Sequence, residues 1–163
     1  MNQSKSNIYF QRKMLNPFYF KLFLLLKLPM AFLAGIKLKE LSCNRAVLQM
    51  KYKYLNKNPF GSIYFACLSM AGELASGLLA SSITHKSTPN ISMLVVGVDI
   101  NFTKKAIGTI FFECDQGEQI LETIQKSITT CEGQTIDVLT VAKNDQGDVV
   151  AKFLIKWSFK VKI

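Results

Sequence analysis

Histidine is almost absent from this chain, because the 163 residues contain only His85. Every Ser/His/Asp or Cys/His catalytic arrangement would have to use that residue, and a metal site built on several histidines is excluded. No CxxC pair occurs among the four cysteines (Cys43, Cys67, Cys114 and Cys131), which disfavours a zinc ribbon or a redox dithiol. We expect reduced thiols, a cytoplasmic location, and neither a metal nor a cofactor.

Acidic residues are nearly missing from the N-terminal third. Residues 1–57 contain eleven Lys and Arg against one acid, Glu40, whereas the remaining residues contain nine Lys against ten acids. The excess of positive charge, +10 against −1, therefore belongs to this segment. It favours an anionic ligand, a membrane surface or nucleic acid as a partner. No recognised nucleic-acid-binding motif accompanies the charge, so we expect no nucleic acid.

An uninterrupted apolar run long enough to cross a membrane is lacking near the N-terminus. Residues 17–36 are broken by Lys21 and Lys27, which together cost about 5–7 kcal/mol at the centre of a bilayer. Pro29 then breaks the helix, and no convincing signal-peptide cleavage site follows. We predict an amphipathic or buried helix over residues 17–28, within a helical extension of about 14–33, and contact with a membrane surface stays open.

A second apolar stretch covers residues 58–83. Asn58 is typical of a helix N-cap, and Pro59 of the first helical position. The following pattern is apolar almost all round, which indicates a helix wrapped by other structure. Glu73 is the only charged residue between Lys57 and His85. Because an unpaired buried carboxylate is costly, we expect Glu73 to be paired, neutral or functional, and burial to raise its pKa.

The rest of the chain is mostly predicted strand. Strands are expected over residues 35–42, 45–53, 91–102, 106–114, 134–143 and 148–163, with a helix over 117–129 and a turn at 144–147. The alternation in one strand places Leu94, Val96, Val98, Ile100 and Phe102 on one face. This order predicts a single α+β domain over residues 1–163, with a curved antiparallel sheet around one long helix.

The segment from Asn58 to Glu73 resembles the hotdog-fold thioesterase superfamily. Its phenylacetyl-CoA thioesterase-like branch carries N-P-x-G-[ST]-[VI]-H-G-G, with an acidic residue seven positions later. Here Tyr64 stands at the His position, Phe65 and Ala66 stand at the two Gly positions, and Glu73 stands at the acidic one. The whole chain is most similar to an uncharacterised hotdog group, domain of unknown function 4442.

This resemblance implies a hotdog fold with an extra N-terminal helix, a homodimer or a dimer of dimers, and acyl-CoA or another acyl thioester as substrate. It implies that Glu73 is a general base or nucleophile and that backbone N–H groups near Phe65 bind the oxyanion. The further site residues that it implies are Tyr64 and Asn58 for catalysis, and Gly61, Ser62, Ala66, Lys104 and Lys105 for substrate binding.

Two alternatives remain at the level of sequence. Eight residues of helix separate Phe65 from Glu73 by about 12 Å, so one helix cannot bring both to the same carbonyl, and a hydrolase would need two antiparallel helices from two subunits. The loss of the His-Gly-Gly residues and the basic N-terminal third instead favour a non-catalytic module that binds acyl groups or lipids. A hydratase is disfavoured because His85 lies outside the helix.

Overall fold

The computed structural model describes residues 5–162. Three helices come first, α1 (Lys5–Leu15), α2 (Pro17–Lys27) and α3 (Pro29–Ala34), and are followed by β1 (Lys37–Leu41), β2 (Ala46–Lys51), a 3-10 turn (Tyr54–Asn56) and the long helix α4 (Phe65–Thr84). The second half contains β3 (Ile91–Phe102), β4 (Thr109–Cys114), α5 (Gly117–Thr130), β5 (Gln134–Asn144) and β6 (Val149–Val161).

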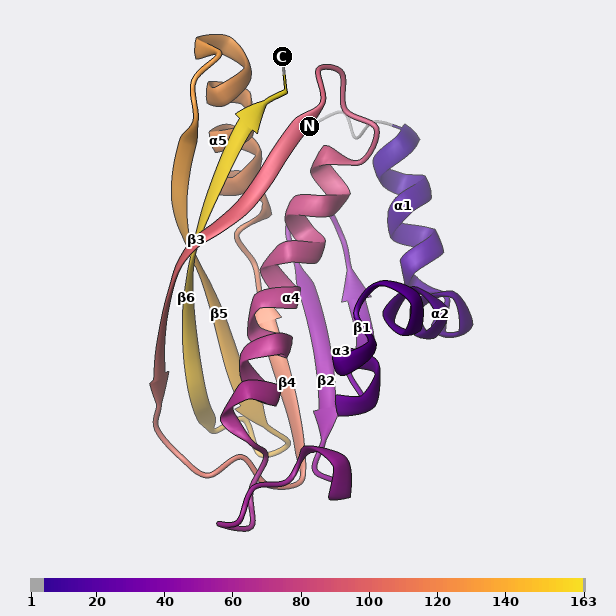
Figure 1. Ribbon diagram of the computed structural model, residues 1–163, viewed down its shortest axis with the longest axis vertical. Coiled ribbons are helices and arrows are strands. Elements are labelled where there is room, and N and C mark those ends of the chain that lie inside the picture. The colour runs from indigo at the N-terminus through magenta and orange to yellow at the C-terminus, as the bar shows by residue number, and fades with distance from the viewer. Residues whose placement is uncertain (1–4, 163) are drawn as a thin grey trace.

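The six strands form one antiparallel sheet in the order β1-β2-β4-β5-β6-β3. The sheet curves around α4, and β1 and β3 are its two edges (Figure 1). This confirms the predicted α+β architecture, a curved antiparallel sheet wrapped around a long central helix.

The core lies between α4 and the concave face of the sheet. Along β6 the inward side chains are buried and the lysines between them are exposed, as the alternation predicts. A Cβ atom on Gly72 would lie 2.5 Å from the ring of Phe153, so only glycine lets α4 approach β6 this closely. Next to this contact, the indole Nε1 of Trp157 donates a hydrogen bond of 2.9 Å to the Oγ of Ser76.

The predicted apolar face of β3 is wrong in its first half. A register shift lies between Val95 and Gly97, where β3 pairs with β6. Before the shift Val95 pairs with the inward Trp157, and after it Val98 pairs with the inward Ile155. An extra residue in a strand reverses which side chains point inward. Strict alternation therefore placed Leu94 and Val96 on the wrong face. Both are exposed, and so are Val98 and Phe102, because the core does not cover this part of the edge strand.

Helix α4 begins at Phe65 rather than at residue 58 or 59, which corrects the prediction that Asn58 is its N-cap and Pro59 its first residue. The physical reason is Gly61, whose φ of +74° is incompatible with a right-handed helix. Residues 58–63 instead form a turn that redirects the chain before the helix starts.

Three N-terminal helices replace the one that was predicted. The helix expected over residues 17–28 is present as α2, and α3 begins after it at Pro29. Helix α1 was not predicted, although Phe10 and Met14, four residues apart, supply its buried face. Among residues 5–162, only α4 is long and apolar enough to cross a membrane, and most of it is buried in this core.

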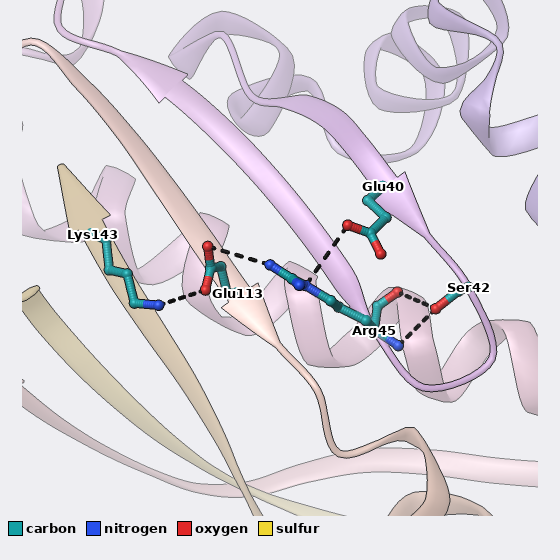
Figure 2. Close-up of polar contacts among 5 residues, drawn as sticks. All are labelled: Glu40, Ser42, Arg45, Glu113 and Lys143. Carbon is teal, nitrogen blue, oxygen red and sulfur yellow. Dashed lines mark hydrogen bonds and ion pairs between the residues drawn. The ribbon is translucent and has the colours of Figure 1, made fainter. Parts of the chain in front are cut away.

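A chain of charged side chains crosses the face of the sheet turned away from α4 (Figure 2). Arg45 lies between Glu40 and Glu113, at 3.7 and 3.5 Å, and Lys143 contacts Glu113 at 2.7 Å. The backbone N–H of Arg45 also donates to the Oγ of Ser42. The cluster links β1, β4 and β5 with the turn before β2. Partly exposed ion pairs of this kind contribute little stability, and none of these charges is buried.

Candidate active site

The first turn of α4 presents backbone N–H groups without partners inside the helix. Phe65 and Ala66 are its first two residues, and N–H groups at these positions have no intrahelical acceptor. Tyr64, the residue before the helix, makes no side-chain capping hydrogen bond to them. These groups also lie at the positive end of the helix dipole, so the start of α4 is suited to an oxygen that carries negative charge.

A groove of about 490 Å³ lies at this helix start, and we call it the α4 groove. Tyr64 and Phe65 are half-exposed in it and meet edge to face, with ring centroids 4.8 Å apart. Phe102 of β3 forms a further edge-to-face contact with Phe65 at 6.5 Å. These three rings form an aromatic part of the wall. The groove is lined by Asn58, Pro59, Phe60, Ser62, Ile63, Tyr64, Phe65, Leu68, Phe102, Thr103, Lys104, Lys105 and Ala106.

Asn58 shapes this groove rather than capping the helix. Its Oδ1 accepts the N–H groups of Phe60 and Ser62 at 3.0 and 3.1 Å, and its Nδ2 donates to the Oγ of Ser62 at 3.0 Å. Both polar atoms are therefore used in holding the turn. Gly61 provides the positive φ of that turn and lines a separate shallow hollow instead of the α4 groove. Ala66 is half-buried and is not among the residues that line the groove.

The two predicted lysines lie at the mouth of the α4 groove. Lys104 forms an ion pair of 3.2 Å with Asp148, and both side chains are about half-exposed. The bond to Lys104 is the main cause that lowers the pKa of Asp148. The Nζ of Lys105 donates to the backbone carbonyl of Phe60 at 3.3 Å. Both lysines line the groove, and each ammonium group already contacts an oxygen of the protein.

Glu73 lies farther along α4 and does not line the α4 groove. It borders two small hollows of about 220 and 240 Å³, which share Leu28, Glu73 and Leu74. No hydrogen bond or ion pair to its carboxylate occurs among residues 5–162. Burial raises the pKa of Glu73, as predicted. Gly77 lies beside the carboxylate, because a Cβ atom added at Gly77 would lie 3.1 Å from Oε1 of Glu73.

The N-terminal helices build the surroundings of Glu73, which the sequence reasoning missed. One hollow lies against Leu28, Pro29 and Met30 at the junction of α2 and α3, and the other lies against Phe10 of α1 and Phe23 of α2. The paired apolar faces of these helices were visible as a periodic pattern, but nothing in the sequence showed that they fold back onto the middle of α4.

The remaining reactive side chains are poor nucleophiles or bases. The ring of His85 contacts Phe10 in a tilted arrangement, with centroids 4.9 Å apart, and His85 follows the C-terminal end of α4, far from its start. Burial raises the pKa of the Cys67 thiol, which keeps it protonated near neutral pH. All four cysteines are free; Cys67 and Cys114 are buried, and Cys131 is exposed. Within residues 5–162, no three His, Cys, Asp or Glu side chains cluster in a way that suits a metal ion.

A curved antiparallel sheet around one long helix, with a groove at the start of that helix, defines a protein of the hotdog class. Residues 18–159 match the family model of domain of unknown function 4442, and the chain belongs to that family. No curated protein matches the chain in sequence.

Solved structures agree with this fold. The chain is similar to PA5026 of Pseudomonas aeruginosa, described as a probable thioesterase, with 18% identity, a TM-score of 0.76, and 90% of this chain and 97% of that one covered. It is also similar to thioesterase HI1161 of Haemophilus influenzae, with 11% identity, a TM-score of 0.64, and coverage of 86% and 88%. At such identities the likeness establishes the fold, and it says nothing about individual residues.

Proposed function

We propose that this protein hydrolyses acyl thioesters such as acyl-CoA, as a homodimer whose sites combine two subunits. The supporting observation is that α4 carries both kinds of group that hydrolysis needs, hydrogen-bond donors and a carboxylate, at different places along its length. Uncapped N–H groups border the α4 groove at one end, and a partly buried carboxylate with no partner among residues 5–162 lies about 12 Å away along the same helix. In an antiparallel pair of such helices, the Glu73 of one subunit meets the helix start of the other.

In this arrangement the thioester carbonyl oxygen accepts hydrogen bonds from the N–H groups of Phe65 and Ala66, where negative charge develops in the transition state. Glu73 removes a proton from water as the water oxygen bonds to the carbonyl carbon, the C–S bond breaks, and the thiolate is protonated. Alternatively the carboxylate attacks the carbon itself, and water then hydrolyses the resulting anhydride. In either route the raised pKa makes Glu73 a stronger base than an exposed carboxylate.

The first experiment removes the carboxylate. Glu73→Gln keeps the side-chain shape, and we expect it to lower thioester hydrolysis by at least about 100-fold across a panel of acyl-CoA substrates. Glu122→Gln, on the exposed face of α5, is the matched control and should leave hydrolysis unchanged. A fully active, folded Glu73→Gln protein would show that Glu73 is not the base.

A second experiment tests the two-subunit site through the backbone donor. Phe65→Pro deletes one N–H at the first position of α4, where proline is favourable, and Tyr64 before it already has the extended backbone that proline requires. Phe65→Ala removes the same ring but keeps the donor, and is therefore the control. We expect only the proline variant to lose hydrolysis.

Mixed subunits then distinguish a shared site from a site within one chain. In a heterodimer of the Phe65→Pro and Glu73→Gln variants, one site contains both defects and the other contains none. With random pairing, co-expression should restore about one quarter of the native sites. No recovery in a confirmed heterodimer would contradict the shared site.

A second candidate function is a non-catalytic module that binds acyl groups. It is favoured by Phe65, whose ring occupies space in the α4 groove that glycine would leave free. Tight binding of a non-hydrolysable acyl-CoA analogue, with no turnover of any thioester in the panel, would support it over the hydrolase. We also propose a cytoplasmic location, which is supported by the four free thiols.

A further inference from the structure

Helices α2 and α3 carry a large apolar surface that the fold does not bury. Phe18, Leu26 and Met30 are 78%, 68% and 63% exposed. We call the whole surface the α2–α3 face, and it consists of Phe18, Leu22, Leu25, Leu26, Met30 and Leu33.

This surface is an ordered stripe and not a scatter of single residues. Its four members on α2 follow the spacing i, i+4, i+7 and i+8, which places them on one side of a helix. Phe20 and Leu24 are buried on the opposite side, where α2 packs on the protein. The buried side of α2 is explained by packing in the fold, but the exposed stripe is not. A contiguous exposed apolar surface is typical of a site that binds another protein or a membrane.

Every charged residue of α1, α2 and α3 is a lysine or an arginine. Residues 1–39 contain seven Lys and Arg and no acid. Lys21 and Lys27 are both exposed on α2, and Lys21 lies directly beside the apolar stripe. An apolar helix face with lysine at its border is complementary to the interface of a bilayer that contains anionic lipids.

A second copy of the chain fits this surface less well. In a symmetric contact both copies would bring Lys21 to one interface, with no acid in the first 39 residues to compensate this charge. The unpaired strand β3 is also at the far edge of the sheet, since α2 packs near β1 (Figure 1). Dimerisation through β3 would therefore leave the α2–α3 face uncovered.

We propose that the α2–α3 face binds to the surface of anionic membranes, with α2 lying in the plane of the interface. The eleven residues of α2 span about 16 Å, roughly half of the hydrocarbon thickness, so this helix lies on the bilayer and does not cross it. Met30 belongs both to this face and to the hollow beside Glu73, so the lipid-facing surface adjoins the candidate carboxylate. The membrane contact stands whether or not the chain hydrolyses thioesters.

Vesicle flotation of the full chain tests this proposal. We expect binding to vesicles of phosphatidylcholine with phosphatidylserine, weaker binding to phosphatidylcholine alone, and release at high salt. Phe18→Ser with Leu26→Ser, and separately Lys21→Glu with Lys27→Glu, should each weaken binding about tenfold or more. Leu154→Ser, an exposed leucine on the sheet, is the control and should bind like the native chain.

Thermal unfolding verifies that each variant is folded, and sedimentation without lipid reports its oligomeric state. Failure of the native chain to float with phosphatidylserine vesicles would overturn the proposal, as would native-like flotation of the folded Phe18→Ser, Leu26→Ser variant. A variant that changes the oligomeric state but still floats would identify the face as a contact between copies of the chain instead.

Discussion

Gly72→Ala measures how closely α4 packs on the sheet. Alanine in the interior of a helix is favoured over glycine by about 1 kcal/mol. The new Cβ would, however, lie 2.5–2.7 Å from three ring carbons of Phe153. That ring is fully buried and is in contact with the rings of Phe102 and Phe112, so it has no free space to enter. Overpacking in such a place costs about 3 kcal/mol.

The net effect is a loss of about 2 kcal/mol in the free energy of unfolding, or about 4–8 °C in melting temperature for a chain of this size. Urea and thermal unfolding measure both quantities. Gly77→Ala is the matched control on the same helix, because its Cβ meets only the mobile end of Glu73 at 3.1 Å and Trp157 at 3.4 Å. We expect it to be neutral or stabilising by up to about 1 kcal/mol. A Gly72→Ala protein as stable as the native one would refute the packing argument.

Three further predictions concern buried polar groups. Ser76→Ala removes the acceptor of the Trp157 indole N–H, so it should cost about 1–3 kcal/mol in urea unfolding, whereas Ser69→Ala, which loses only a bond within its own helix, should cost less than 1 kcal/mol. Asn56→Ala removes the partner of one buried carbonyl, one partly buried carbonyl and one partly buried N–H, and should cost at least about 2 kcal/mol by the same assay; an unchanged midpoint would contradict this. Because burial raises the pKa of Glu73, the folded state keeps this proton to a higher pH than the unfolded state does. The native protein should therefore lose stability as the pH rises from the ordinary carboxyl range through the raised pKa, and Glu73→Gln should lack this decline; parallel stability curves would show that Glu73 does not cause it.

The fold was predictable where periodicity decides the structure. The alternation in β6 and the all-round apolar pattern of α4 leave only one economical arrangement, a sheet wrapped around a helix. The predictions failed where a single residue changes the local backbone geometry. The extra residue between Val95 and Gly97 reverses the face of β3, and the positive φ of Gly61 delays the start of α4. Neither feature has a periodic signature.

The candidate site was predictable only in part. The residues at the start of α4 came from a linear motif, and Tyr64, Phe65 and Ser62 do line one groove. The aromatic wall from Phe102 and the helices over Glu73 depend on contacts between segments distant in the chain. Such contacts follow from the topology, which the composition and spacing of any single segment do not specify.

Glu73 and Gly77 each lower the stability of the fold, and they lie one turn apart on α4. Their proximity supports a function for Glu73. A carboxylate is kept among apolar side chains with no partner among residues 5–162, at a cost that a glutamine or leucine would avoid. One helical turn away, Gly77 gives up about 1 kcal/mol of helix stability relative to alanine. The Cβ of an alanine there would lie 3.1 Å from Oε1 of Glu73, so the flexible carboxylate would have to shift slightly, whereas the glycine leaves its present position free. Stability alone would select neither residue, and sites where local rules are broken together are where function is expected.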